Sequence, residues 1–494
     1  MKTFAYIKNI GFGLALVLLS NCATNPVTGR KQLVMMSEKQ EIAMGEQSDP
    51  EIMAFFGSYT DPQLQKFISE KGQEMVKISH RNNITYEFKI VDSPVINAFA
   101  TPGGYVYFTR GIMAHFNNEA EFAGVLGHEI GHVTARHSVI QQRNAMLGQL
   151  GLIAGVILVP ELSNFVEPLS SGMQLALMSF GRDAERQSDK LGVEYSTRIG
   201  YDASEMAEFF KTLQRQEQAG GGEKIPDFLS THPSPEERNI TVTKLASEWK
   251  TKLKLTNPKI NRDSYLKKID GLIVGEDPKQ GFVESNIFYH PVMKFQFTIP
   301  ANWKLQNTPQ QVQMAPDNGE AMLMLTLAGK VPLEEAAHKL LKDYNLTPVE
   351  SQKETINGLD AILIVADQKQ EGGTIRVLST LIQYEGNVYS FMAISERSKF
   401  PVYQAAFLST VKNFKPLTDT DKLNRKPDVI RIKTVPQSMT AQAAFQNFNM
   451  PSNRFEELAI LNGMQMNDRL DKGTLIKVIE KQASSDVLAK KSSQ

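Results

Sequence analysis

The stretch H-E-I-G-H at residues 128–132 constrains this chain more than any other, because it fixes two imidazoles relative to each other. It lies in a largely apolar run that predicts a buried helix over residues 118–144. Positions i and i+4 share one face of a helix, so His128 and His132 can hold one Zn²⁺. Glu129 lies about 100° round the same helix, a place that suits a general base better than a ligand.

A catalytic zinc ion needs a third protein ligand, which we predict farther along the chain. Glu185 and Asp189 are again i and i+4, on a stretch with a helical pattern that ends near Gly200. We expect Glu185 to bind the zinc and Asp189 to accept the second ring N–H of a zinc histidine. The alternative is an ordinary charged helix face, which the upstream histidine pair makes the weaker interpretation.

The H-E-I-G-H helix followed by this E-x-x-x-D pattern resembles the gluzincin family of HtpX-type and CAAX-prenyl-type zinc metallopeptidases, most closely its periplasmic BepA-like branch. The supporting stretches are N-P-V-T-G-R at 25–30, N-A-F-A-T-P-G-G at 97–104, T-H-P-S-P at 231–235, and Arg238. The resemblance covers about residues 25–250. It implies an endopeptidase with one Zn²⁺ per chain, the ligands His128, His132 and Glu185, and the base Glu129.

His232 lies on a loop just before a helix predicted to begin near residue 235. A lone histidine is ordinarily a core or surface residue. The resemblance implies instead that His232 can reach the zinc as a fourth ligand, which blocks water and is displaced on activation. Arg238 would polarise the substrate carbonyl or pair with a carboxylate. His137 lies about 140° round the predicted helix from His132 and is not expected to bind the metal.

Alternating apolar residues predict strands at 86–91, 96–100 and 105–109, the last two joined by a T-P-G-G turn. An edge strand of this small antiparallel sheet can hold an extended peptide by main-chain hydrogen bonds. We assign that role to the hairpin, with a purely structural hairpin as the alternative. The assigned residues are Asn97, Ala98, Phe99, Gly103 and Gly104.

The first 21 residues have the basic start and short apolar run of a signal peptide. They end in L-L-S-N-C, which resembles a bacterial lipobox with Cys22 as the lipidated residue; a plain secretory signal is the alternative. Cys22 is the only cysteine of the chain, which fits an oxidising periplasm. With Ala23 next, resemblance to lipoprotein sorting implies anchoring to the outer membrane of a Gram-negative bacterium.

Residues 145–160 are almost entirely apolar and would span ~24 Å as a helix, short of the ~30 Å core of a bilayer. We interpret them, with residues 161–180, as a hydrophobic lid or membrane-leaning arm over the cleft. A single transmembrane pass is the alternative.

The chain is therefore predicted to be an α+β multidomain protein. The first part is a mainly helical zincin peptidase domain with a small antiparallel sheet. An α+β sheet domain with helices on one face, which resembles PsbP-like and Mog-type domains, follows it. A small module that resembles LysM comes last, with a structural cap as its alternative. The predicted ranges are 1–21 signal peptide, 22–48 tether, 49–250 peptidase, 251–284 linker, 285–417 sheet domain, 418–433 linker, 434–480 LysM-like module and 481–494 disordered tail.

Lysine plus arginine equals aspartate plus glutamate at 54 each, so no overall field favours nucleic acid, and none is expected as a partner. The expected substrates are unfolded or extended proteins, by resemblance misfolded or stalled envelope proteins, and a LysM-like module would bind peptidoglycan. A lipid-anchored envelope chaperone or assembly adaptor with a structural zinc is the rival function. An aminopeptidase would share the zinc motif but needs an acidic pocket that the sequence does not locate.

Overall fold

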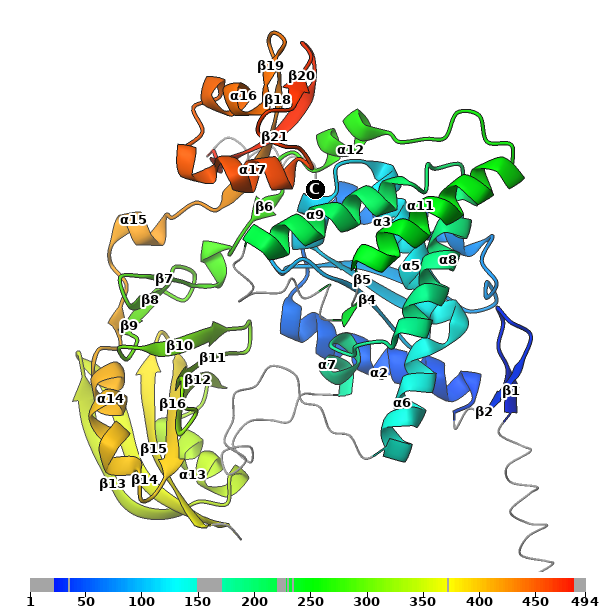
Figure 1. The fold of residues 1–494 in the computed structure, drawn as a ribbon. Coiled ribbons are helices and arrows are strands. Elements are labelled where there is room, and N and C mark those ends of the chain that lie inside the picture. The colour runs from blue at the N-terminus through cyan, green and yellow to red at the C-terminus, as the bar shows by residue number, and fades with distance from the viewer. Residues whose placement is uncertain are drawn as a thin grey trace, which may run out of the picture.

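The computed structural model of the chain is shown in Figure 1. It describes residues 22–33, 36–148, 171–219, 228, 231–232, 235–370 and 373–483. A helical domain, a sheet domain and a small C-terminal module can be distinguished, and the C-terminal module lies against the helical domain (Figure 1). The predicted signal peptide, most of the apolar arm and nearly all of the polar tail lie outside the described residues. No helix among the described residues is both long and apolar enough to cross a membrane.

The helical domain is built around α5 (Glu119–Ala135), the helix that carries H-E-I-G-H, and every residue of α5 is buried. Asn118 is its N-cap, and the Asn118 side chain accepts from the backbone N–H of Glu121, as a helix start requires. The other helices are α2 (Glu38–Phe56), α3 (Pro62–Val76), α4 (Arg110–His115), α6 (His137–Gly148), α7 (Ser171–Ala176), α8 (Arg182–Arg198), α9 (Glu205–Ala219), α11 (Pro235–Lys252) and α12 (Arg262–Lys268). A hairpin of β1 (Cys22–Thr24) and β2 (Lys31–Leu33) precedes them.

Helix α8 packs directly on α5, and glycines make this contact possible. A Cβ atom built on Gly192 would lie 2.9 Å from the carbonyl oxygen of Gly124 and 3.0 Å from the backbone nitrogen of His128. No side chain fits at such a separation, so the two backbones meet at this point. Because Glu185 and Asp189 precede Gly192 on α8, this crossing brings both carboxylates to α5.

The predicted helix over residues 118–144 is two helices, and this part of the prediction is wrong. Arg136 ends α5 in the left-handed conformation, with φ 60°, and α6 begins at the next residue. The Arg136 guanidinium donates to Glu41 of α2 at 2.8 Å. This buried ion pair stabilises the left-handed conformation at Arg136. A helical pattern in the sequence does not reveal such a long-range contact.

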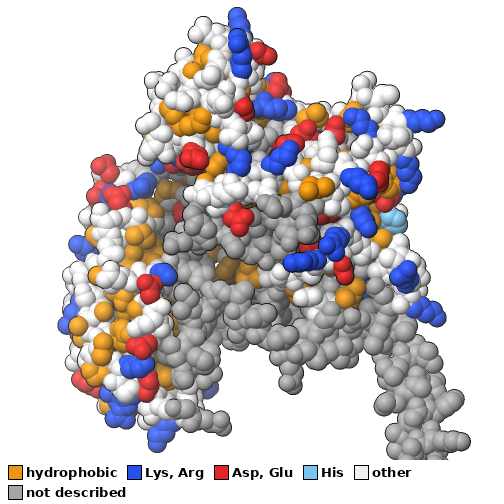
Figure 2. All heavy atoms as spheres, viewed as in Figure 1, with side chains coloured by type: hydrophobic (Ala, Val, Ile, Leu, Met, Phe, Trp, Pro, Cys, Tyr) orange, Lys and Arg blue, Asp and Glu red, His pale blue; other side chains and the backbone are white. Residues whose placement is uncertain are grey.

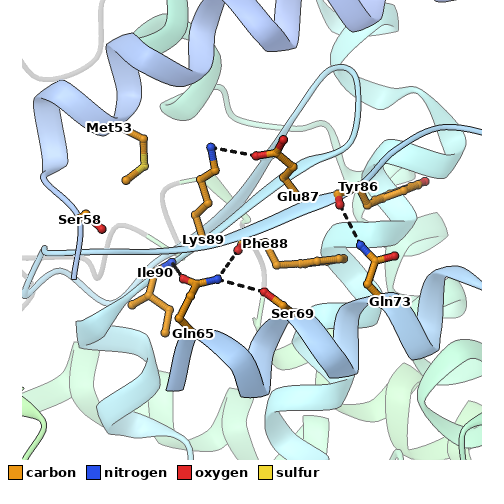
Figure 3. Close-up of a pocket in the computed structure, with 10 residues that line it drawn as sticks. All are labelled: Met53, Ser58, Gln65, Ser69, Gln73, Tyr86, Glu87, Phe88, Lys89 and Ile90. Carbon is orange, nitrogen blue, oxygen red and sulfur yellow. Dashed lines mark hydrogen bonds and ion pairs between the residues drawn. The ribbon is translucent and has the colours of Figure 1, made fainter. Parts of the chain in front are cut away.

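The small sheet has the strand order β3–β5–β4, from β3 (Glu87–Val91), β4 (Ala98–Thr101) and β5 (Tyr105–Thr109). The hairpin of β4 and β5 is antiparallel as predicted, but β3 runs parallel to β5, so the sheet is mixed. Helix α3 closes the outer edge of β3 with side-chain amides (Figure 3). Gln65 donates to Phe88 O at 2.6 Å and accepts from Ile90 N at 3.2 Å, while Gln73 donates to Tyr86 O at 2.9 Å. The pocket drawn in Figure 3 therefore lies on the edge of the sheet opposite β4.

Two predicted boundaries of this domain do not match the elements found. The boundary between tether and peptidase domain at residues 48 and 49 falls inside α2, whose Glu41, Gly45 and Ser48 are buried against the rest of the domain. The predicted linker 251–284 is largely folded, because α12 and β6 (Ile273–Val274) contribute Tyr265 and other apolar side chains to the main core.

The sheet domain contains a seven-stranded antiparallel sheet in the order β10–β11–β12–β16–β15–β14–β13. Helix α13 (Leu333–Asp343) packs on one face through Leu340, and α14 (Phe400–Lys412) packs on the other through Phe407. The prediction that the helices lie on one face only is therefore wrong. The strands are β10 (Trp303–Asn307), β11 (Gln311–Pro316), β12 (Ala321–Gly329), β13 (Thr347–Ile356), β14 (Leu359–Gln370), β15 (Gly373–Tyr384) and β16 (Asn387–Glu396). A second sheet, in the order β17–β9–β8–β7, consists of β7 (Phe282–Glu284), β8 (Ile287–His290), β9 (Phe295–Thr298) and β17 (Lys415–Pro416). The 3-10 helix η2 (Pro278–Gln280) precedes β7, and α15 (Thr420–Leu423) follows β17.

The C-terminal module, residues 428–481, begins with β18 (Asp428–Thr434), inside the predicted linker 418–433. Its other elements are β19 (Met439–Thr440), α16 (Ala441–Asn447), η3 (Ser452–Arg454), α17 (Phe455–Leu461), β20 (Arg469–Leu470) and β21 (Leu475–Lys481). Strand β18 pairs with β21 and also with β6 of the helical domain. The fully buried Lys477 of β21 donates to Ala114 O at 2.9 Å and to Phe116 O at 3.0 Å. The module is thus bonded into the helical domain.

Lysine and arginine side chains are interspersed with aspartate and glutamate on the face of the molecule shown in Figure 2. This mixture agrees with the formal net charge of zero.

Candidate metal centre

Four side chains from three parts of the chain meet at the centre of the helical domain. His128 and His132 come from α5, Glu185 from α8 and His232 from the segment before α11, and one ligand atom of each lies within 4.8 Å of the others. The Nε2 atoms of His128 and His132 are 3.0 Å apart. Glu185 Oε1 lies 3.4 Å from His132 Nε2 and 2.9 Å from His232 Nδ1. We call these four residues the ligand cluster, a buried group able to bind a metal ion.

The orientation of His128 is fixed by a contact on the side of its ring that faces away from the cluster. Its Nδ1 lies 3.0 Å from Asp189 Oδ1, where the carboxylate accepts the ring N–H, so Nε2 is left with a lone pair toward the cluster. Arg238 donates to both oxygens of Asp189, at 2.9 and 2.8 Å, and its Nη1 lies 3.2 Å from Glu185 Oε2. Arg238 therefore neutralises part of the carboxylate charge around the cluster.

The residues present fit a divalent metal. The His128 lone pair points at His132 Nε2 from 3.0 Å, where it can meet either a ring N–H of His132 or a cation that the two nitrogens share. Two ligands bound to Zn²⁺ at 2.0–2.1 Å in a tetrahedral site lie about 3.3 Å apart. Five pairs of atoms in the cluster are 2.9 to 3.6 Å apart, close to that value. Burial by itself would raise the pKa of Glu185, but His232 and Arg238 more than offset it and hold this pKa well below its usual range. Glu185 is therefore anionic, as a carboxylate that binds a cation must be.

Glu129 lies next to the cluster without a bonded partner. Both carboxylate oxygens are buried and accept no hydrogen bond, and Oε1 is 3.6 Å from His232 Nε2. Burial raises the pKa of Glu129, because the charged form loses its hydration. A buried carboxylate with free oxygens and a raised pKa is suited to accept a proton, as a general base must.

Aromatic rings cover the cluster. The ring of Phe180 lies 4.0 Å from the ring of His132, centroid to centroid, and the ring of Phe228 lies 4.6 Å from that of His232. His128 and Glu129 are 0% exposed. The site is therefore closed to solvent in this conformation.

The hairpin residues lie close to the site only in part. Strand β4, with Ala98 and Phe99, is an edge of the sheet, and the backbone of Phe228 donates to Ile96 O at 3.0 Å just before it. Gly103 and Gly104 instead form the turn at positive φ, 83° and 102°. A Cβ atom on Gly103 would lie 3.0 Å from Ile42 Cα, so this end of the hairpin packs against α2.

Some residues of the site were not predicted from the sequence. His137 was not expected to bind the metal, and no role beside a ligand was predicted for it, but its Nδ1 lies 3.1 Å from His132 Nδ1. Gln187 in turn lies 3.0 Å from His137 Nε2. The signal for Gln187 is its place between Glu185 and Asp189, but only the break at Arg136 brings His137 to it. Cys22 opens β1.

Comparison with known proteins supports the resemblance stated from the sequence. Residues 62–246 match the model of peptidase family M48. The beta-barrel assembly-enhancing protease of Yersinia pestis is 30% identical over 233 residues, 46% of this chain and 48% of that protein. The mitochondrial metalloendopeptidase OMA1 of Arabidopsis thaliana is 31% identical over 180 residues, 36% of this chain and 35% of that protein. The matches thus span half or less of the length of these two relatives.

Among solved structures, a cyanobacterial PsbP protein from Synechocystis is similar to part of the chain. The match covers 26% of this chain and 91% of that protein, with 9% identity and a TM-score of 0.23. The PsbP-like and LysM-like assignments stay predictions.

Proposed function

We propose that this chain, with its peptidase family M48 region at residues 62–246, is a zinc metalloendopeptidase of the bacterial cell envelope. One observation carries the proposal: Glu129 lies beside the ligand cluster with both carboxylate oxygens buried and unbonded. A purely structural metal site has no use for such a carboxylate, because leaving it unpaired in the interior costs free energy. A hydrolase needs it as a proton acceptor.

His128, His132 and Glu185 would hold the zinc, which when bound supplies Lewis-acid chemistry that polarises a carbonyl and makes water more acidic. Glu129 accepts a proton from the water that attacks the peptide carbonyl and then delivers it to the leaving amine. Asp189 keeps His128 in the ligating tautomer, and Arg238 holds Asp189 in place. The closed cluster excludes bulk water until a substrate enters.

The substrates that fit this site are extended segments of unfolded or misfolded proteins. Ala98 and Phe99 lie on β4, whose edge would pair with a substrate main chain after the cover of the site opens. Pairing through the main chain gives affinity with little sequence preference, which suits a protease of misfolded envelope proteins. A lipid on Cys22 and a glycan-binding C-terminal module would keep the enzyme at the outer membrane and the peptidoglycan.

Metal analysis combined with a casein assay tests the proposal. The purified protein is expected to contain one zinc ion per chain and to cleave casein internally. A chelator should abolish the cleavage, and added zinc should restore it. The protein would instead be the adaptor with a structural zinc if it keeps its zinc but never cleaves casein. That result must hold even when Phe180 or Phe228, whose rings cover the site, is substituted.

His232 is expected to act as the gate of the site. Its Nδ1 lies 2.9 Å from Glu185 and 3.3 Å from His128 Nε2, so it fills the fourth position that a catalytic metal needs open. His232→Ala should raise casein cleavage about tenfold or more, because an open minor state is ordinarily populated at ~0.1–10%. The rate is measured with zinc content held equal.

The control for the gate is His338→Ala, which removes an exposed histidine of α13 in the sheet domain and should leave the rate unchanged. If His232→Ala leaves proteolysis at the wild-type rate under all conditions, His232 is not a gate.

A further inference from the structure

His132 has a support on its outer side that differs in kind from the support of His128. The outer nitrogen of His128 faces the carboxylate of Asp189. The outer nitrogen of His132, Nδ1, instead faces the imidazole of His137 at 3.1 Å. His137 is only 5% exposed, and its remaining nitrogen, Nε2, lies 3.0 Å from Gln187 Oε1. Three side chains in a row therefore lead from α8 to the ligand cluster.

The hydrogens in this row can be assigned from one end. The side-chain oxygen of Gln187 only accepts, so His137 Nε2 carries a hydrogen and donates it. A neutral imidazole with its hydrogen on Nε2 has a lone pair on Nδ1, which accepts from His132 Nδ1. His132 Nε2 is then left without a hydrogen, facing His128 Nε2 and Glu185 Oε1. That is the tautomer a metal ligand must have.

Ser188 is the other polar group at this nitrogen. Its hydroxyl lies 3.3 Å from His137 Nδ1, farther than the 3.1 Å of His132 Nδ1. A serine hydroxyl rotates to suit its neighbours and can accept as well as donate. It therefore adjusts to the row and does not determine the tautomer.

The charge of the site explains why a neutral support suits His132. Glu129, Glu185 and Asp189 are three buried carboxylates. Apart from histidines, Arg238 is the only positively charged side chain among the described residues that forms an ion pair with any of them, and it pairs with Glu185 and Asp189. With all three carboxylates ionised, Arg238 and one divalent cation balance their charge. A further carboxylate behind His132 would leave an uncompensated buried charge, which costs several kcal/mol. His137 and Gln187 supply orientation without adding charge.

We propose that Gln187 and His137 form a neutral hydrogen-bond relay that fixes His132 as the tautomer with its Nε2 free for the metal. They are positioning residues that set metal affinity and do not contact the substrate. The proposal rests on the metal site of the proposed function.

Zinc affinity of the full chain, measured by competition with a chelating dye, tests the relay. His137→Phe keeps a flat ring but removes both nitrogens, and should weaken zinc binding about 10- to 100-fold, the usual effect of losing such a support. Gln187→Met keeps the length of the side chain but removes the acceptor, and should weaken binding about tenfold. Gln187 is half-buried, so this variant tests the relay even if His137→Phe does not fold.

Gln187→Glu retains an acceptor oxygen at the same position but adds a charge, which stays partly hydrated because residue 187 is half-buried. It should bind zinc more tightly than Gln187→Met, whereas a role in packing alone would not separate the two variants. Gln446→Met, the same change at an exposed site in α16, is the control. The absorption spectrum of the cobalt-substituted protein should change with Gln187→Met and not with Gln446→Met, as expected if His132 is reoriented.

Wild-type zinc affinity in both His137→Phe and Gln187→Met would overturn the relay. Failure of the proposed function gives a different result, since a protein that binds zinc but does not cleave casein can still show the affinity loss. If the wild-type chain binds no zinc, both proposals are wrong.

Discussion

Glu129→Gln is expected to abolish cleavage of casein while the protein keeps its zinc. The substitution preserves the size of the side chain but removes its ability to take up a proton, and none of the ligand atoms is altered. Losing a general base slows a reaction by about 10²–10⁴-fold. The residual rate of casein cleavage by this variant should therefore be close to that of the chelated enzyme. Cleavage is followed by gel or fluorescence assay, with zinc content measured on the same preparation.

Glu70→Gln is the matched control, because it makes the same chemical change on α3 at a side chain that is 65% exposed. It should cleave at the wild-type rate. The assignment of Glu129 as a base is wrong if Glu129→Gln retains activity. If the variant loses its zinc as well as its activity, Glu129 maintains the structure of the site instead.

Lys477→Ala is expected to lower the stability of the protein by about 4 kcal/mol. The side chain is fully buried between the C-terminal module and the helical domain, where it donates to two carbonyls at the end of α4. Truncation leaves both acceptors buried without a partner, at about 1–3 kcal/mol each. For domains of 150–250 residues, 1 kcal/mol corresponds to about 2–4 °C, so the midpoint of thermal unfolding should fall by roughly 10 °C.

The comparison is with Lys472→Ala, which removes an exposed lysine from the same module and should change the midpoint by less than about 2 °C. Calorimetry on the full chain measures both variants. A midpoint for Lys477→Ala equal to that of Lys472→Ala would mean that the module is loosely attached and contributes nothing to the stability of the helical domain.

The sequence was most informative where function depends on local spacing. The pair His128 and His132 follows from helical geometry alone, and the match of Glu185 and Asp189 to a second helix follows from the same rule. The first helix begins at the predicted place, although it ends at Ala135, and the second helix was found as expected. Short-range rules suffice there because the residues concerned are held by one element.

The errors arise where distant residues decide the local conformation. The break between α5 and α6 depends on Glu41, which is 95 residues away from Arg136. Parallel pairing of β3 with β5 needs a crossover through β4, and the strand pattern by itself does not reveal the direction of pairing. Placing α13 and α14 on opposite faces of the sheet is likewise a property of the folded chain, because both faces of the central strands are apolar.

The sequence by itself determined the chemistry of this protein: two imidazoles and a carboxylate at helical spacing, and a second pair of carboxylates to complete the site. The tertiary structure alone decided which groups surround that site. It brings His137 behind His132 and Lys477 into the helical domain. The physical reason is that ligand spacing is a property of one helix, whereas each of these contacts depends on how separate elements pack.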